Sequence, residues 1–66
     1  MDKYEAIAEA FRQARANGSG YAFAVYSPPN PNFPEGLWQV ARSKPLLRTR
    51  EWVVIECTAD GKQVLA

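Results

Sequence analysis

Cys57 is the only cysteine of the chain, and histidine is absent from the sequence. Nucleophilic catalysis needs a nucleophile and a base that activates it, and histidine is the usual base for serine or cysteine. Cys57 also lies in the apolar, β-type run 51–58, where a thiol is expected to be buried and unreactive. The sequence therefore predicts no nucleophilic site, no disulfide within the chain and no zinc ligand set.

Carboxylates are scattered along the chain and show no arrangement that implies a shared acid–base cleft. Besides Asp2, they are Glu5, Glu9, Glu35, Glu51, Glu56 and Asp60. A phosphate-binding glycine loop precedes a helix, whereas Gly18 and Gly20 follow the predicted one. We therefore expect a protein that is not an enzyme and that holds no metal and no cofactor.

One segment of the chain concentrates positive charge. Residues 42–50 contain Arg42, Lys44, Arg48 and Arg50, and no acidic residue. Basic groups can bind phosphates while aromatic side chains stack on bases. Aromatic residues of the predicted sheet are Tyr21, Phe23, Tyr26, Trp38 and Trp52. The net charge of +1 attracts no polyanion by itself, and no RNP or GXXG signature is present. A nucleic-acid-binding module is thus the alternative hypothesis.

The N-terminal segment predicts one amphipathic helix over about residues 2–17. Asp2 and Glu5 have the spacing of a capping box, and Gly18 suits the left-handed position after the helix. Helical spacing places a mixed set of residues on one face. This set is Tyr4, Ile7, Ala8, Phe11, Ala14 and Arg15. We expect this helix to cover a sheet.

Alternating aromatic, β-branched and small residues predict strands at about 21–27 and 37–43. Ala22 and Ala24 form a shallow strand face that suits close packing of an alanine-rich helix, although the opposite orientation is also compatible with the pattern. Four of the five prolines lie in the stretch 28–36, which excludes helix and central strand there. Phe33, within this loop, could either fill the core or remain exposed as a contact.

The C-terminal segment predicts a β-hairpin with strands at about 51–58 and 62–66. The Asp60-Gly61 dipeptide suits a two-residue type I′ turn, in which both residues have positive φ. In that register Cys57 faces Val64 and Glu56 faces Leu65. The fold class expected is α+β: one N-terminal helix packed on a three- to four-stranded antiparallel sheet, in a single small domain spanning 1–66.

The predicted hairpin has large apolar groups on both faces, and one helix is too narrow to cover both. The second face would carry Trp52, Val54 and Leu65, extended by Trp38 and Val40. Exposed apolar surface marks interfaces, and Trp, Tyr and Arg are enriched at binding hot spots. We therefore expect a partner-binding site of Trp38, Trp52, Val54, Leu65 and Phe33, unless a strongly coiled sheet closes this face with Phe33 and residues 46–47.

A chain of 66 residues buries a small core, and association is a common supplement to it. The N-terminus lacks a secretory apolar region, and a lone thiol suits a reducing cytoplasm. The leading hypothesis is a small non-enzymatic binding protein that dimerises or docks on a larger protein and modulates it. Its size suits a bacterial or phage accessory protein.

Overall fold

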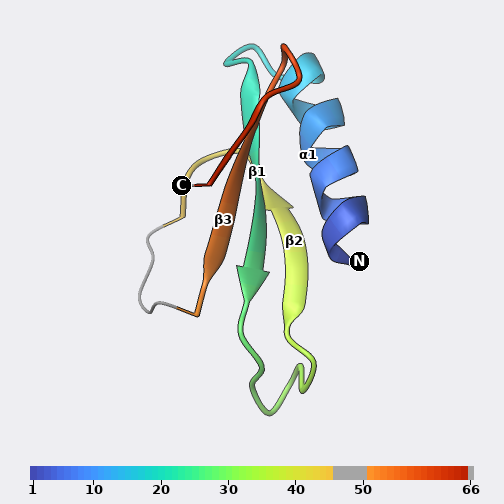
Figure 1. Cartoon of the computed structure of the whole chain (residues 1–66), viewed down its shortest axis with the longest axis vertical. Coiled ribbons are helices and arrows are strands. Elements are labelled where there is room, and N and C mark those ends of the chain that lie inside the picture. The colour runs from blue at the N-terminus through green and yellow to red at the C-terminus, as the bar shows by residue number, and fades with distance from the viewer. Residues whose placement is uncertain (46–50, 66) are drawn as a thin grey trace.

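The structure is a computed structural model that describes residues 1–45 and 51–65. It is α+β, with one helix packed on a four-stranded antiparallel sheet, which confirms the predicted fold class (Figure 1). The elements are α1 (Lys3–Ala16), β1 (Tyr21–Ser27), β2 (Leu37–Ala41), β3 (Val53–Thr58) and β4 (Gln63–Leu65). Arg48 and Arg50, like residues 46–47, lie outside the described residues. Within the described part, no helix has the length and apolarity needed to cross a membrane.

Helix α1 begins with the predicted capping box. The Asp2 carboxylate accepts from the Glu5 backbone N–H at 2.8 Å, and the Glu5 carboxylate accepts from the Asp2 backbone N–H at 3.1 Å. The expected left-handed conformation of Gly18 is wrong, because Asn17 caps the helix in an extended conformation and the positive φ of this turn falls on Gly20. The residue with positive φ therefore lies two positions later than predicted.

The face of α1 that meets the sheet differs from the predicted one. Ala6, Ala10 and Ala14 are buried against the sheet, with larger apolar side chains flanking them. Tyr4 is 78% exposed, and Ala8 and Arg15, which were also placed on the inner face, are exposed. The alanine stripe faces the sheet because small side chains let the helix approach the sheet closely. Ile7 and Phe11 pack beside this stripe.

Strand β1 is the centre of the sheet, whose order is β2-β1-β3-β4. Ala22 and Ala24 are fully buried under α1, so the small-residue face of β1 is the one that meets the helix. Strands β2 and β3 both pair antiparallel with β1 and hence run in the same direction. The chain returns from the end of β2 to the start of β3 through a connection whose residues 46–50 lie outside the described part.

The loop between β1 and β2 is a structured extension beyond the end of the sheet (Figure 1). Asn30 and Phe33 exchange backbone hydrogen bonds of 3.1 and 3.0 Å, and the Asn30 side chain accepts from the backbone N–H groups of Asn32 and Phe33. Gly36 has φ +82° and ends the loop with its N–H donating to the Phe33 carbonyl. Prolines and these hydrogen bonds together give the loop a defined shape.

The turn between β3 and β4 is not the predicted type I′ turn. Only Gly61 has positive φ, and its N–H donates to the Thr58 carbonyl, while the Thr58 N–H donates to the Lys62 carbonyl. This is a three-residue loop, a type I turn followed by a left-handed glycine. Glu56 therefore pairs with Val64, and the register differs by one residue from the predicted one. A slip of one residue exchanges the two faces of the strand.

Candidate functional site

The five residues predicted to bind a partner do not form one surface. Trp38 lies on the helix side of the sheet, where the centroid of its ring lies 5.2 Å from that of Tyr26, with the two rings tilted by 43°. Trp52 lies on the opposite side, packed against the cluster of Phe23, Val25 and Val54. The predicted extension of the Trp52 face by Trp38 and Val40 is wrong, because β2 turns both residues toward α1.

The far face of the sheet is not an open apolar surface. Phe23, Val25 and Val54 are at most 2% exposed, and the described residues that pack against them include Ala41 and half-buried Trp52. The expectation that Val54 meets a partner is therefore wrong for the folded chain. The alternative closed this face with Phe33 and residues 46–47: Phe33 does not cover it, and residues 46–47 lie outside the described part of the chain.

Phe33 lies in the loop beyond the sheet and is 45% exposed, so it does not fill the core. A shallow hollow of about 320 Å³ borders it and is lined by five consecutive loop residues. They are Asn32, Phe33, Pro34, Glu35 and Gly36. Among the described residues, no other element lines this hollow, so it is a concave bend of the loop surface and not an enclosed ligand cavity. Phe33 remains available as a contact residue.

The apolar residues with the clearest exposure on the sheet belong to β4. Leu65 is 75% exposed and Val64 is 53% exposed. Leu65 pairs with Ile55 and therefore lies on the helix side, whereas Val64 pairs with Glu56 and lies on the far side. The predicted faces of Val64 and Leu65 are thus exchanged, and sequence reasoning missed Val64 as a surface residue. The signal that could have placed it is Thr58, which binds Asp60 and favours the longer turn.

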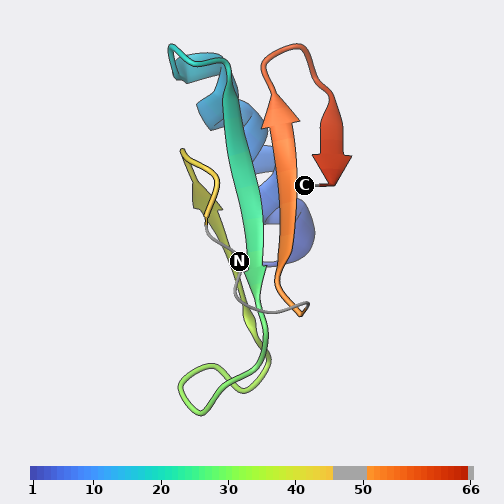
Figure 2. The ribbon, with the colours of Figure 1, turned by 90° about the vertical axis from the view of Figure 1, so that its left-hand side faces the viewer.

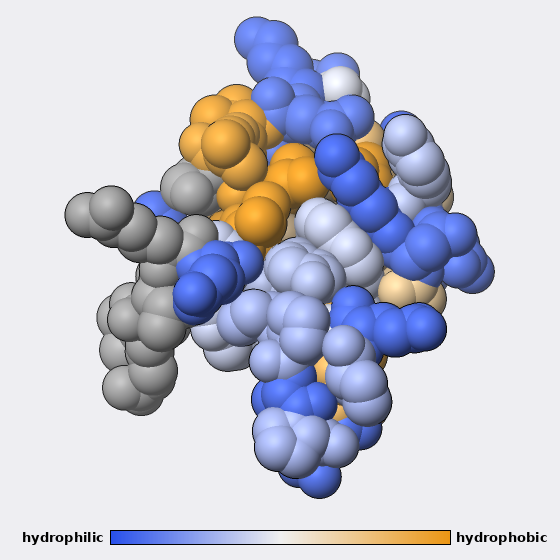
Figure 3. All heavy atoms as spheres, turned by 60° about the horizontal axis from the view of Figure 1, so that its bottom comes forward, coloured by the Kyte–Doolittle hydropathy of each residue, from blue (hydrophilic) through white to orange (hydrophobic). Residues whose placement is uncertain are grey.

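Helix α1 does not cover β4. It lies against β1, β2 and β3 and makes no contact with Gln63, Val64 or Leu65. Figure 2 shows α1 behind β1 and β3. Strand β4 lies on the other side of β3 from β1, at the edge of the sheet. On the face drawn in Figure 3, the most hydrophobic residues gather mainly in one patch beside hydrophilic ones. Among the described residues, β4 is paired with β3 alone, and Val64 and Leu65 on it are exposed.

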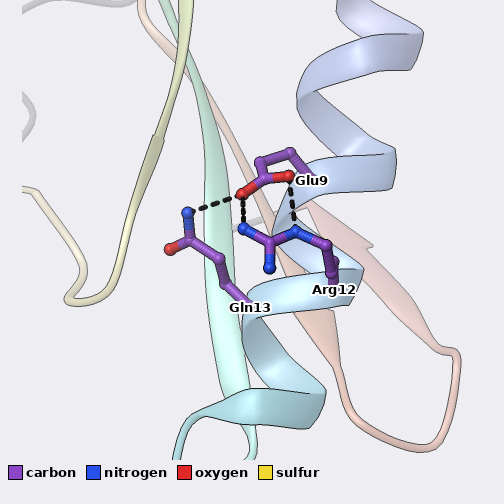
Figure 4. Close-up of polar contacts among 3 residues, drawn as sticks. All are labelled: Glu9, Arg12 and Gln13. Carbon is purple, nitrogen blue, oxygen red and sulfur yellow. Dashed lines mark hydrogen bonds and ion pairs between the residues drawn. The ribbon is translucent and has the colours of Figure 1, made fainter.

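Of the four basic residues predicted to bind nucleic acid, Arg42 and Lys44 lie in the described part of the chain. Arg42 and Lys44 are exposed. Arg42 borders a hollow of about 200 Å³ together with Arg12 and the end of α1. The Arg12 guanidinium is engaged by Glu9, whose carboxylate also accepts from Gln13 at 3.0 Å (Figure 4). This ion pair offsets the positive charge on the helix side of that hollow.

The groups that could carry chemistry are placed in ordinary structural roles. Cys57 is fully buried, and burial followed by the nearby Glu56 charge raises the pKa of its thiol. Asp60 lies in the β3–β4 turn, where the hydrogen bond from Thr58 is the main reason that its pKa is lowered. Among residues 1–45 and 51–65, no three His, Cys, Asp or Glu side chains gather in a way that could hold a metal ion.

The chain matches no family model, no curated protein and no solved structure.

Proposed function

We propose that this protein is a small, non-enzymatic, cytoplasmic binding protein that dimerises or docks on a larger protein and modulates it. The observation that supports this proposal is the β4 edge, where Val64 and Leu65 are exposed on opposite faces of a strand that, within residues 1–45 and 51–65, pairs only with β3. Natural proteins usually protect an edge strand with charge, proline, a bulge or a covering helix. Residues 63–65 contain no charge and no proline, and α1 leaves them uncovered.

Such an edge binds protein by a known physical mode. An added strand pairs with the open backbone groups, and its side chains pack beside the exposed apolar ones on each face. Backbone pairing gives affinity to many extended segments, while Leu65 and Val64 select apolar neighbours. Phe33 lies in the β1–β2 loop and does not adjoin β4, so it would form a separate contact.

Site-specific photo-crosslinking in cells that make the protein tests this function. A photoreactive residue replaces Leu65 in one variant and Tyr4 in the matched control, because Tyr4 is as exposed as Leu65 but belongs to α1. We expect protein adducts at position 65 and none at position 4. The absence of adducts at position 65, or equal adducts at both positions, would contradict the proposal. Adducts that nuclease digestion removes would favour the nucleic-acid alternative instead.

A further inference from the structure

The hydrogen-bonding pattern of the β3–β4 pair shows which backbone groups of β4 point away from β3. The Thr58 N–H donates to the Lys62 carbonyl, so these two residues form a hydrogen-bonded pair. Hydrogen-bonded and non-hydrogen-bonded pairs alternate along an antiparallel ladder. With Glu56 opposite Val64 and Cys57 opposite Gln63, Val64 directs its backbone groups toward β3. Gln63 and Leu65 therefore direct theirs outward.

We propose that these outward groups pair with β4 of a second copy of the chain, antiparallel and centred on Val64. This inference rests on the proposed function, in that it names the protein that the β4 edge binds. In this register Gln63 of each copy lies opposite Leu65 of the other, and these residues exchange hydrogen bonds through the backbone groups that point away from β3. Val64 meets Val64 of the second copy in a non-hydrogen-bonded pair, where side chains approach most closely.

The edge is self-complementary in chemistry as well as in hydrogen bonding. A two-fold axis perpendicular to the sheet keeps both copies of Leu65 on the helix side and both copies of Val64 on the far side. No like charges oppose each other within residues 63–65, because this stretch is uncharged. The other edge strand, β2, is followed at once by exposed Arg42 and Lys44, which would repel a second copy there.

The size of the chain favours such an association but limits its strength. The protein exposes 4592 Å², whereas about 4,200 Å² is expected for a folded monomer of 7.4 kDa. Surface is therefore available for burial. A three-residue strand with two exposed apolar side chains buries less than the roughly 800 Å² per partner of a standard stable interface. The dimer is hence expected to form reversibly in the micromolar range or above.

The first test is oxidation of the purified full chain carrying Val64→Cys. The non-hydrogen-bonded pair separates the two α-carbons by about 4.5 Å, which is within the roughly 4.4–6.8 Å that a disulfide spans. We expect rapid formation of a disulfide-linked dimer. The matched control is Tyr4→Cys, a more exposed position away from β4, which should still react only at the slow rate of random collision. The unaltered chain should not cross-link, because Cys57 is buried.

The second test is sedimentation of the unaltered chain and of Val64→Lys from micromolar to millimolar concentration. Val64 lies opposite Glu56 in its own chain, so the new ammonium group is tolerated by the monomer and is repelled by its copy across the two-fold axis. We expect loss of the dimer, whereas Tyr4→Lys, with the same added charge, should retain it. Circular dichroism verifies that both variants are folded.

Three outcomes would overturn this inference while leaving the proposed function to its own test. They are a chain that stays monomeric at millimolar concentration, equal disulfide formation at positions 64 and 4, and a dimer that persists in Val64→Lys. Adducts of a different, larger protein at position 65 in cells, combined with a monomeric purified chain, would support β4 as a binding edge but assign it to another partner. Absent adducts at position 65 would contradict the proposed function itself.

Discussion

Gly36 lies directly against the ring of Tyr26, at the point where the 28–36 loop enters β2. A Cβ added to Gly36 would be 2.6 and 2.7 Å from two carbons of that ring. Gly36 also has φ +82°, a backbone conformation that residues other than glycine rarely adopt. Tyr26 in turn stacks on Trp38, so this glycine connects the shape of the loop to the packing on the helix side of the sheet.

Gly36→Ala is expected to lower the free energy of unfolding by about 2–4 kcal/mol, combining backbone strain with overpacking. Gly18→Ala is the matched control, because Gly18 has no positive φ and nothing lies within 4 Å of an added Cβ. That change should be neutral or raise stability by up to about 1 kcal/mol. Urea unfolding of both variants measures the difference, and equal stabilities would contradict both the clash with Tyr26 and the backbone strain at this φ.

The alanine stripe of α1 makes a second prediction about packing. Ala10 is fully buried against the sheet, whereas Ala8 is exposed on the same helix. Ala10→Leu should lower the free energy of unfolding by about 1–3 kcal/mol, because the added side chain forces α1 away from β1. Ala8→Leu should change it by less than about 0.5 kcal/mol. If Ala8→Leu is destabilised and Ala10→Leu is not, the helix would face the sheet with the residues expected from the sequence, and not with the alanine stripe.

Local signals in the sequence predict much of this fold. The Asp2–Glu5 capping box, the bounds of β1 and the proline-rich loop each depend on a few adjacent residues, and the structure shows all three. The inner face of α1 could not be chosen in the same way. Helical periodicity favoured larger side chains such as Tyr4, whereas the short distance between helix and sheet selects Ala6, Ala10 and Ala14.

The candidate site was less predictable because it depends on register and on contacts distant in sequence. Asp60-Gly61 fits two kinds of hairpin turn, and a difference of one residue between them exchanges the faces of Val64 and Leu65. Val54 is buried in a cluster with Phe23 and Val25 of β1, which are distant from it in sequence. No pattern within the hairpin alone shows that the far face is closed.

The Glu9–Arg12 pair predicts a pH dependence at the surface of α1. Hydrogen bonds from Arg12, then from Gln13, lower the pKa of Glu9 from 4.5 to about 2. Because the pKa of the folded state is depressed, the stabilisation is fully present above pH 4.5 and is lost as the pH falls from 4.5 toward 2. Arg12→Ala should raise the pKa of Glu9 toward its ordinary value, and NMR titration of the Glu9 carboxyl carbon measures this.

Arg15→Ala is the control for that titration, because the Arg15 guanidinium lies over the ring of Phe11 at 5.9 Å and is not hydrogen-bonded to Glu9. It should leave the pKa of Glu9 low. An unchanged pKa in Arg12→Ala would show that the ion pair does not persist in solution.

Substitution of Trp52 distinguishes a role of this residue in the core from a role in binding. Its ring packs against Phe23, Val25 and Val54, so Trp52→Ala removes cover from a buried cluster. Because Trp52 is only half-buried, the free energy of unfolding should fall by about 2 kcal/mol, less than for a fully buried tryptophan. Tyr4→Ala, which removes an exposed aromatic ring, should cost less than about 0.5 kcal/mol.

If Trp52→Ala instead keeps full stability and weakens association, Trp52 is a contact residue, as the sequence alone suggested. The structure predicts the reverse: folded Trp52→Ala molecules should self-associate as the unaltered chain does, because β4 is intact.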